Sequence, residues 1–279
     1  MSQPILSLEH VNVSRGGAPV LRDINLILHA GEHLAILGPN GCGKSTLLKT
    51  VTGELYPLAL PGTVVSIFGR PRWDLTELRQ RLGVVSSDLP GRPFLQTSGF
   101  DAILTGFFSS STLWPNLSVT AAMRSRAEDL LHQVGATDLR HQLVGQMSAG
   151  QQRRILIARA LAGSRAAAHL QAASDPSSSH PVPPGEMLLL DEPSNALDLA
   201  AQGELRNLLR QLAGQGTAIL LITHHTSDII PEINRLLLMR KGRIAADGPK
   251  HDLLTAPNLS NLFGTPIDLT ERDGFFHAW

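Results

Sequence analysis

Hydrophobic residues in the first 37 positions fall into three short segments separated by turns. The segments read ILSLEHVNV, PVLRDINLIL and HLAIL, with breaks at 15–17 (RGG) and 30–31 (AG). Alternation of apolar and polar residues between glycine-containing turns is typical of β-strands. We therefore expect an antiparallel sheet over residues 5–37 that leads into a buried strand.

Farther along the chain, helical and strand-like patterns alternate. A further pair of strands is expected at 63–69 and 82–87, and a region rich in Ala, Leu and Arg predicts helices between positions 98 and 162. An expected strand, an amphipathic helix, a second strand and a strand pair then follow at 187–190, 197–214, 217–223 and 235–248. This order predicts an α/β fold with a mostly parallel, helix-covered sheet.

Residues 164–185 interrupt this pattern. The segment SRAAAHLQAASDPSSSHPVPPG contains four prolines and five serines and has no apolar periodicity. We expect its second half to be a flexible surface insertion, because such insertions are well tolerated on protein surfaces. A docking segment is the functional alternative.

Composition bounds the size and location of the protein. With 279 residues, 42% of them hydrophobic, the chain can bury one sizeable core, so we expect a single domain over 1–279. The 24 basic and 24 acidic residues leave no broad charge footprint, so no direct nucleic-acid partner is expected. No apolar run reaches the length of a membrane helix, one cysteine excludes an intrachain disulfide, and MSQPILSLEH lacks the features of a secretory signal. A cytoplasmic location is therefore expected.

A phosphate-binding loop is predicted at 38–46, between the apolar HLAIL and the helix-like LLKTVTGEL. Its GPNGCGKST sequence fits the P-loop pattern in the strand–loop–helix setting that the pattern requires. Glycines let backbone N–H groups surround phosphates, a lysine neutralises the β and γ oxygens, and a serine hydroxyl binds Mg²⁺. The predicted nucleotide-binding residues here are Gly38, Pro39, Asn40, Gly41, Cys42, Gly43, Lys44, Ser45 and Thr46, with Ser45 also a metal ligand.

Two acidic residues follow the buried strand MLLL, at the strand end where open α/β sheets bind ligands. Asp191 is suited to the water shell of Mg²⁺, and Glu192 could orient or deprotonate an attacking water. A helix cap would explain such a pair if it stood alone.

The stretch MSAGQQRR at 147–154 separates this chain from P-loop kinases, GTPases and helicases. Here the sequence resembles the ATP-binding cassette (ABC) family. MSAGQ is similar to the family's LSGGQ signature, DEPSNALD (191–198) to its Walker B and D-loop run, and LITHH (221–225) to its switch-histidine segment. The motifs occur in the family's order over most of the chain. The resemblance implies a RecA-like P-loop NTPase core with an N-terminal antiparallel β subdomain and a helical subdomain inserted at about 88–165, and Mg²⁺-dependent hydrolysis of ATP to ADP and phosphate.

The resemblance also implies how two phosphate-attracting helix ends share one ligand. Two copies, or one copy and a related cassette, are expected to pair head to tail, so that the signature of one chain closes on ATP held by the other. His224 is expected to touch the γ-phosphate and position Glu192, and Asp198 to couple the two sites. The signature residues expected at the nucleotide are Ser148, Ala149, Gly150 and Gln151.

Several positions depart from the family pattern. Arg15 stands near where an aromatic residue usually stacks on adenine, and its guanidinium plane could stack instead. Ser87 aligns with a glutamine that senses Mg²⁺ and the transport partner, so we expect a shorter, water-mediated metal contact and an altered coupling route. Ala149 replaces a glycine and adds one methyl group, which we expect to be tolerated. The pattern is also similar to the single-cassette branch of molybdenum-transport ATP-binding proteins.

Cys42 lies inside the phosphate loop, at a position that is variable in the family. A thiol near a helix N-terminus can be activated. We expect alkylation of Cys42 to block ATP binding and Mg-ATP to protect the thiol.

Three functions remain open from the sequence. The first is the ATP-hydrolysing subunit of a membrane transporter, peripheral on the inner face of the membrane and docked to a separate permease. The second is a soluble ABC ATPase that acts on a nucleic-acid or protein complex, and the third, an inactive sensor, is disfavoured because the catalytic residues are in place. Candidate permease-docking residues in 88–120 are Phe100, Phe107, Phe108 and Trp114, each as readily explained by core packing. The tail at 251–279 is too short for a regulatory domain, and its last aromatic residues are expected to pack on the core.

Overall fold

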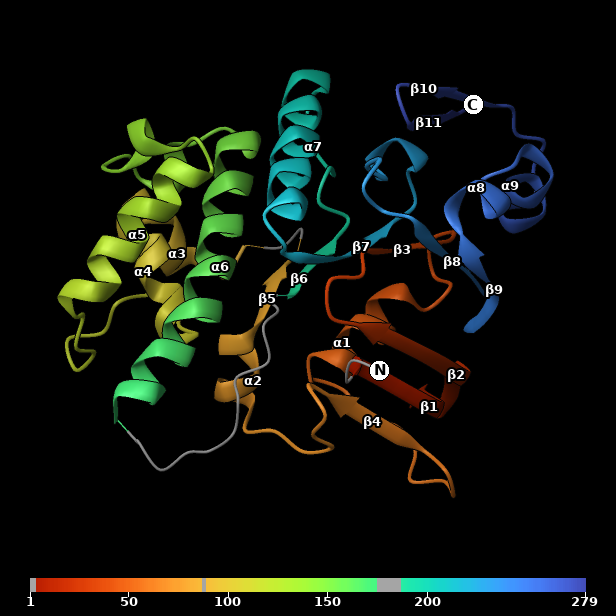
Figure 1. Cartoon of the computed structure of the whole chain (residues 1–279), viewed down its shortest axis with the longest axis horizontal. Coiled ribbons are helices and arrows are strands. Elements are labelled where there is room, and N and C mark those ends of the chain that lie inside the picture. The colour runs from red at the N-terminus through yellow and green to blue at the C-terminus, as the bar shows by residue number, and fades with distance from the viewer. Residues whose placement is uncertain (1–3, 87–88, 175–186) are drawn as a thin grey trace. The chain divides into compact units, whose positions relative to one another are not determined.

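The computed structural model describes residues 4–86, 89–174 and 187–279. It divides into two compact units (Figure 1). The first unit contains 1–73, 190–192 and 210–279, and the second contains 74–189 and 193–209. Each unit is described separately below.

The N-terminal sheet of the first unit has the strand order β2-β1-β4. β1 (Pro4–Arg15) and β2 (Ala18–His29) pair antiparallel, and β4 (Val64–Ile67) pairs antiparallel with the other side of β1. Gly16 and Gly17 turn the chain between β1 and β2 with φ angles of 56° and 81°. Positive φ at both central positions is the geometry of the tight hairpin turn whose twist matches paired strands. The predicted antiparallel N-terminal sheet is confirmed.

Within the first unit, a second sheet has its strands in the order β7-β3-β8-β9. β3 (Leu34–Leu37) is parallel to β7 (Ala218–Thr223) and to β8 (Arg235–Arg240), whereas β8 pairs antiparallel with β9 (Arg243–Pro249). All residues of β3 and β7 are buried, as expected for parallel strands covered on both faces. β6 (Met187–Asp191) enters this unit at its last residues. The predicted strand pair at 235–248 is thus confirmed.

One predicted pairing is wrong. The segments at 63–69 and 82–87 were expected to form a strand pair, but β4 pairs with β1, and β5 (Leu82–Val85) lies beside β6 in the second unit. Helix α2 (Leu75–Arg81) lies between β4 and β5 along the chain. Because a strand pattern indicates a strand but not its partner, the error concerns only the pairing.

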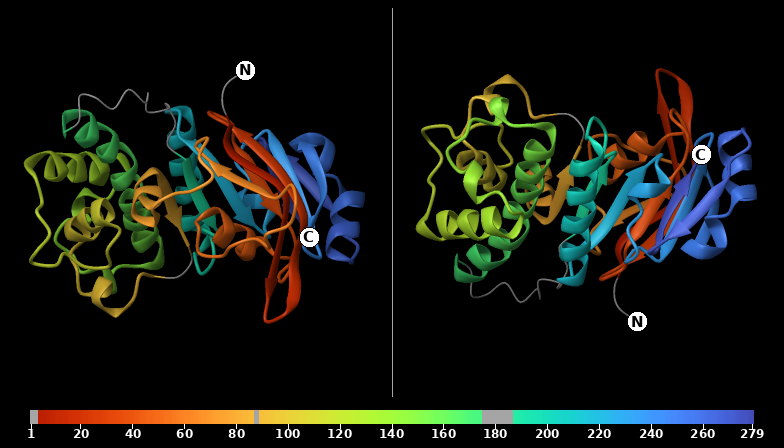
Figure 2. Two further views of the ribbon diagram at one scale, coloured as in Figure 1. Left: turned by 90° about the horizontal axis from the view of Figure 1, so that it is seen from below. Right: turned by 90° about the horizontal axis from the view of Figure 1, so that it is seen from above.

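Helices and a terminal hairpin complete the first unit. They are α1 (Lys44–Val51), the 3₁₀ turn η4 (Thr226–Asp228), α8 (Lys250–Leu253), α9 (Ala256–Phe263), β10 (Leu269–Arg272) and β11 (Phe275–Ala278). Figure 2 shows the red N-terminal strands and the blue C-terminal elements of this unit from two further sides. The last aromatic residues were expected to pack on the core. Phe276 is buried, which confirms the expectation for that residue, but Trp279 has 67% of its surface exposed, so the expectation is wrong for Trp279.

The second unit is mostly helical and surrounds α6 (Ala149–Ser174). Its other elements are α2, β5, α3 (Arg92–Leu95), α4 (Gly99–Leu104), η1 (Thr105–Phe108), α5 (Ala121–Gln133), η2 (Thr137–Leu139), η3 (Val144–Gln146) and most of α7 (Leu199–Gly214). Ile155, Ile157 and Ala158 of α6 are fully buried. α6 continues to Ser174, so the first half of the 164–185 segment is helical, while 175–186 lie outside the described residues.

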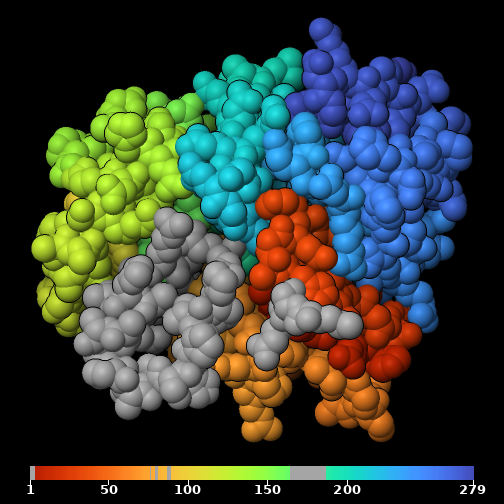
Figure 3. All heavy atoms as spheres, viewed as in Figure 1, coloured from red at the N-terminus to blue at the C-terminus, as the bar shows by residue number. Residues whose placement is uncertain are grey.

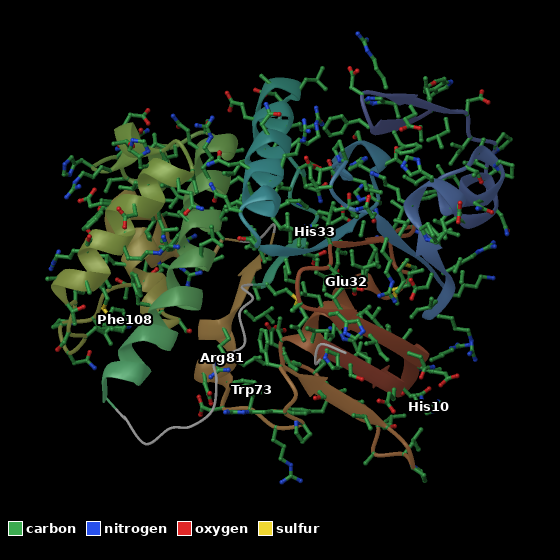
Figure 4. The ribbon with its side chains drawn as sticks, viewed as in Figure 1. His10, Glu32, His33, Trp73, Arg81 and Phe108 are labelled. Carbon is green, nitrogen blue, oxygen red and sulfur yellow. The ribbon has the colours of Figure 1, made fainter. Side chains whose placement is uncertain are left out.

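The candidate docking aromatics of the second unit differ in exposure. Phe100 and Phe107 are buried, and the Arg140 guanidinium lies 4.5 Å from the centre of the Phe100 ring. Phe108, labelled in Figure 4, is half-buried, whereas Trp114 has 59% of its surface exposed. Core packing therefore accounts for Phe100 and Phe107, and Trp114 stays available for a partner.

Candidate active site

Other residues of the first unit pack closely against the loop between β3 and α1. A Cβ atom added to Gly38 would lie 2.3 Å from the Met239 carbonyl oxygen, and one added to Gly43 would lie 2.9 Å from Leu21 Cδ2. Gly43 also has a φ of 110°, which side chains rarely adopt. The loop is also bonded to the turn between β8 and β9, because Gly242 N–H donates to the Cys42 carbonyl at 2.8 Å. Both motif glycines are thus required by close approach.

Lys44 is the first residue of α1, and its side chain curls back over the loop. Its ammonium donates to the Gly38 carbonyl at 2.7 Å and to the Pro39 carbonyl at 3.2 Å. Only 6% of its surface is exposed. A buried cation beside the N-terminal end of a helix attracts an anion strongly. The loop therefore fits the phosphate group that its sequence predicts.

Glu192 lies between this cation and a histidine. Its Oε1 is 3.4 Å from Lys44 Nζ, and its Oε2 is 2.6 Å from His224 Nδ1. His224 N–H also donates to Oε2 at 3.3 Å, while Glu192 N–H donates to the Ile222 carbonyl at 2.8 Å. The three side chains come from α1, the end of β6 and the end of β7, all in the first unit. They form a Lys–Glu–His cluster beside the phosphate loop.

The histidine is supported by residues that sequence reasoning did not identify. Thr223 Oγ1 donates to Asp228 Oδ2 at 2.7 Å and accepts from His225 N–H at 3.0 Å. The rings of His224 and His225 have centres 3.9 Å apart and are tilted by 41°. A threonine directly before the switch histidine, with an aspartate five residues later, was the available sequence signal.

Of the three predicted metal ligands, the structure describes Ser45 and Asp191. Asp191 ends β6 with a half-buried side chain, and Ser45 is exposed in the first turn of α1. Among the described residues there is no group of three or more His, Cys, Asp or Glu that could hold a metal ion by itself. Mg²⁺ usually retains several waters and binds one or two protein groups plus phosphates, so Ser45 and Asp191 suit it. Ser87 lies outside the described residues. The backbone carbonyl of its neighbour Ser86 accepts a 2.7 Å hydrogen bond from Arg153 Nη1.

The predicted signature residues belong to the second unit and begin α6. Gln151 N–H donates to Ser148 Oγ at 3.3 Å, and Ser148 N–H donates to Gln151 Oε1 at 2.9 Å. This reciprocal pair is a capping box, which leaves other first-turn N–H groups available to an anion. A Cβ on Gly150 would lie 2.9 Å from Ala201 Cβ. Close packing on α7 thus requires glycine at 150, while Ala149 is accommodated in the first turn.

Asp198, Arg15 and Cys42 are placed differently from one another. Asp198 Oδ1 accepts from Ala201 N–H at 2.8 Å and so caps the start of α7. Arg15 ends β1 and is exposed.

Cys42 is buried, and burial raises the pKa of its thiol even though Lys44 opposes the shift. The expectation of an activated thiol is therefore wrong, because desolvation outweighs the nearby positive charge.

Comparison with known proteins identifies the family. A family model described as "ABC transporter" matches residues 21–168, over half of the chain. The chain belongs to the ABC transporter family. It is 36% identical to a cobalt import ATP-binding protein, CbiO, of Rhodobacter capsulatus, over 88% of this chain and 79% of the relative. It is 34% identical to a hemin import ATP-binding protein, HmuV, of Bordetella bronchiseptica, over 95% and 94%.

A solved structure supports the same assignment of this ABC protein. CbiO1 of Clostridium perfringens, described as part of the ABC transporter complex CbiONQ, superposes with a TM-score of 0.72 at 25% identity and covers 93% of this chain and 94% of that chain. The chain is thus the ATP-binding, ATP-hydrolysing subunit of an ABC transporter. Of the functions left open by the sequence, the transporter ATPase is confirmed. No helix among the described residues has the length and hydrophobicity to span a membrane.

Proposed function

We propose that the Lys–Glu–His cluster is the hydrolytic centre of this ABC ATPase and that Mg²⁺ is its metal. The observation that carries the proposal is the position of the Glu192 carboxylate, 3.4 Å from Lys44 Nζ and 2.6 Å from His224 Nδ1 beside the phosphate loop. Residues 38–46 would hold the phosphates of ATP, and Ser45 and Asp191 would hold Mg²⁺, which when bound neutralises phosphate charge.

Each residue of the cluster has a distinct task. Lys44 supplies positive charge to the terminal phosphates, and Glu192 orients water and accepts its proton. His224 holds the Glu192 carboxylate in place through Nδ1, which must carry the hydrogen of that bond, and this leaves Nε2 for the γ-phosphate. Arg15 is proposed to contact the base. In this arrangement hydrolysis depends on Glu192, whereas nucleotide binding depends on Lys44.

We further propose a head-to-tail dimer as the working state. Ser148, Gly150 and Gln151 begin α6, whose free N–H groups suit a phosphate, and a second copy or a related cassette would bring this helix end to ATP. Asp198 would then lie near the shared sites while it caps α7. Removal of the γ-phosphate contacts would reopen the dimer and move the attached membrane subunits.

The cargo is proposed to be a metal ion or metal complex, taken up by import. The support comes from two relatives, which are described as a cobalt import and a hemin import ATP-binding protein. A membrane partner is supported by the CbiO1 relative, which belongs to a transporter complex. The ATPase would sit on the inner face of that membrane, bound to a permease. The finer similarity to molybdenum-type subunits stays a prediction that these relatives do not support.

A matched lysine pair in α1 tests the nucleotide site. Lys44→Ala should reduce ATP affinity by at least about tenfold, because it removes the buried ammonium from the loop. Lys49→Ala, five residues later in the same helix, should bind ATP like the wild type. Equilibrium binding of a fluorescent ATP analogue measures both, and equal affinities of the two variants would contradict the proposed role of Lys44.

A further inference from the structure

The segment that follows the catalytic histidine is held at both of its ends. We define the switch loop as residues 224–231, between β7 and the segment that leads to β8. At its beginning, His225 N–H donates to Thr223 Oγ1 at 3.0 Å, and Thr223 Oγ1 donates to the buried Asp228 at 2.7 Å. These bonds fold the loop into η4, directly after His224.

A buried lysine holds the other end of the switch loop. Lys250 Nζ donates to the Pro231 carbonyl at 3.1 Å and to the Ile230 carbonyl at 3.4 Å. Only 1% of Lys250 is exposed, and burial lowers the pKa of its ammonium. Burial of a cation is costly unless it serves as a hydrogen-bond donor. Here it donates to two loop carbonyls, which fixes the path of the loop.

The C-terminal hairpin, β10–β11, packs on this lysine and on the loop. Phe276 is 4% exposed, with its ring centre 5.9 Å from Lys250 Nζ and 5.6 Å from the ring of His251. The hairpin turn lies so close to the loop that a Cβ on Gly274 would be 3.1 Å from Pro231 Cγ. β11 also contacts η4. Figure 3 shows the C-terminal part of the chain, in blue, as one continuous area of the surface.

Between the switch loop and the hairpin lies a cavity of about 300 Å³. Its lining includes His224, His225, Thr226, Phe263, His277 and Trp279. The catalytic histidine is therefore not packed tightly on this side. Besides its two hydrogen bonds to Glu192, His224 depends on the anchored ends of the loop for its position. A loop released from Lys250 and Phe276 would have room to move into the cavity.

We propose that Phe276 of the C-terminal hairpin and Lys250 of α8 together position the switch loop and thereby keep His224 where it supports ATP hydrolysis by Glu192. Both are positioning residues, because they act through the loop and do not touch the reacting groups. This inference rests on the proposed role of His224 in hydrolysis. The phosphate loop is tied separately through Gly242, so nucleotide binding should not depend on the hairpin.

Kinetic measurements on the full chain test the proposal. Phe276→Ala and Lys250→Met should each lower kcat for ATP by about tenfold and change KM by less than about twofold, whereas deletion of the His224 side chain should cost roughly a hundredfold or more. Phe276→Leu should recover most of the lost kcat. Arg272→Ala is the matched hairpin control, because that side chain is 84% exposed. Lys250→Met gives a reading that does not depend on the folding of Phe276→Ala.

A double-mutant cycle separates positioning from general destabilisation. If the hairpin acts through the histidine, Phe276→Ala should not lower single-turnover ATP cleavage further in a His224→Ala chain. An additive loss, or a loss of ATP affinity equal to the loss of kcat, would overturn the inference. Wild-type turnover by His224→Ala would instead refute the proposed role of His224. Inactive His224→Ala together with normal kcat in Phe276→Ala and Lys250→Met would refute the inference alone.

Discussion

Glu192 adopts a left-handed backbone conformation, with a φ of 48°, immediately after β6. Non-glycine residues in this conformation are uncommon and cost free energy, which the surrounding contacts must offset. Here the carboxylate bonds to His224 and lies near Lys44, and the Glu192 N–H donates to β7. The strain aims the carboxylate at the phosphate loop. It is thus consistent with the hydrolytic role proposed for Glu192.

The identities of the site residues were predictable, but their mutual contacts were not. Gly38, Lys44 and Glu192 lie in short motifs with fixed chemistry, so the sequence alone identified them. The 3.4 Å approach of Lys44 to Glu192 joins residues 148 positions apart and depends on the parallel sheet. No local pattern carries that information.

The Cys42 thiol should react slowly in the native chain, although its position near a helix N-terminus suggested an activated thiol. Because burial raises the pKa of the thiol, little thiolate forms at pH 7.5, and iodoacetamide should label the native chain at least about tenfold more slowly than the urea-unfolded chain. Mass spectrometry of the intact protein measures both rates, since Cys42 is its one cysteine. Labelling of the native chain at the unfolded rate would show that the thiol is accessible. Whether the alkylated chain loses ATP binding stays a prediction.

At the scale of elements, the C-terminal hairpin shows a missed signal. Asp273–Gly274 is an Asp-Gly pair, with Arg272 before it and Phe275 after it, and this pair is a strong indicator of a two-residue hairpin turn. The structure has φ angles of 54° and 77° at these positions. Each strand has only four residues, so periodicity alone did not reveal them. The turn chemistry would have.

The start of α6 was placed correctly for a physical reason. Ser148 and Gln151 have the spacing of a capping box before an apolar helical run, and the structure shows both of its hydrogen bonds. The end of α6 was not predicted. Its last residues are rich in alanine, which favours helix, but the prolines and serines that follow made 164–185 as a whole look like one segment without helical periodicity.

His33, which bonds to β7, should make the free energy of unfolding depend on pH. Its Nδ1 accepts a 3.2 Å hydrogen bond from Ile219 N–H of β7, and burial lowers the pKa of the imidazole (Figure 4). The unfolded chain therefore binds a proton more readily, so stability from this group is full above the ordinary pKa of about 6.5 and is lost as pH falls below it. His33→Gln keeps an acceptor and should lose less unfolding free energy between pH 7 and pH 5.

Urea unfolding at the two pH values measures that difference. His141→Gln is the control, because His141 is exposed and should leave the pH dependence of the wild type unchanged. An equal pH dependence in His33→Gln and in the wild type would show that His33 does not contribute to acid sensitivity.

At the scale of the whole molecule, the two phosphate-attracting helix ends belong to different units. The P-loop begins α1 in the first unit, and the signature begins α6 in the second. If ATP sites form between two chains, a chain with a damaged P-loop and one with a damaged signature should complement each other. Each mixed dimer would retain one intact site.

Mixing therefore tests dimerisation without a structure of the dimer. Lys44→Ala and Ser148→Arg should each be inactive alone, and an equimolar mixture should recover about a quarter of wild-type turnover per chain, since half of the dimers would be mixed and each would hold one intact site. The control is a mixture of the Lys44→Ala chain with a double variant that carries both Lys44→Ala and Ser148→Arg. This mixture has no intact P-loop and should stay inactive. A mixture that stays inactive while mixed dimers form would indicate that the sites are not shared as proposed.

The hydrolytic role of Glu192 is tested by comparing ATP turnover by Glu192→Gln with turnover by Glu204→Gln. Glu204 serves as the control because its carboxylate is exposed on α7. If Glu192 accepts the proton of the attacking water, its variant should bind Mg-ATP within about threefold of wild-type affinity and release phosphate at least about a hundredfold more slowly. Glu204→Gln should match the wild type in both measurements. Phosphate release by Glu192→Gln at the wild-type rate would contradict the proposed role of Glu192. The carboxylate held by Lys44 and His224 would then not be the group that accepts the proton of the attacking water.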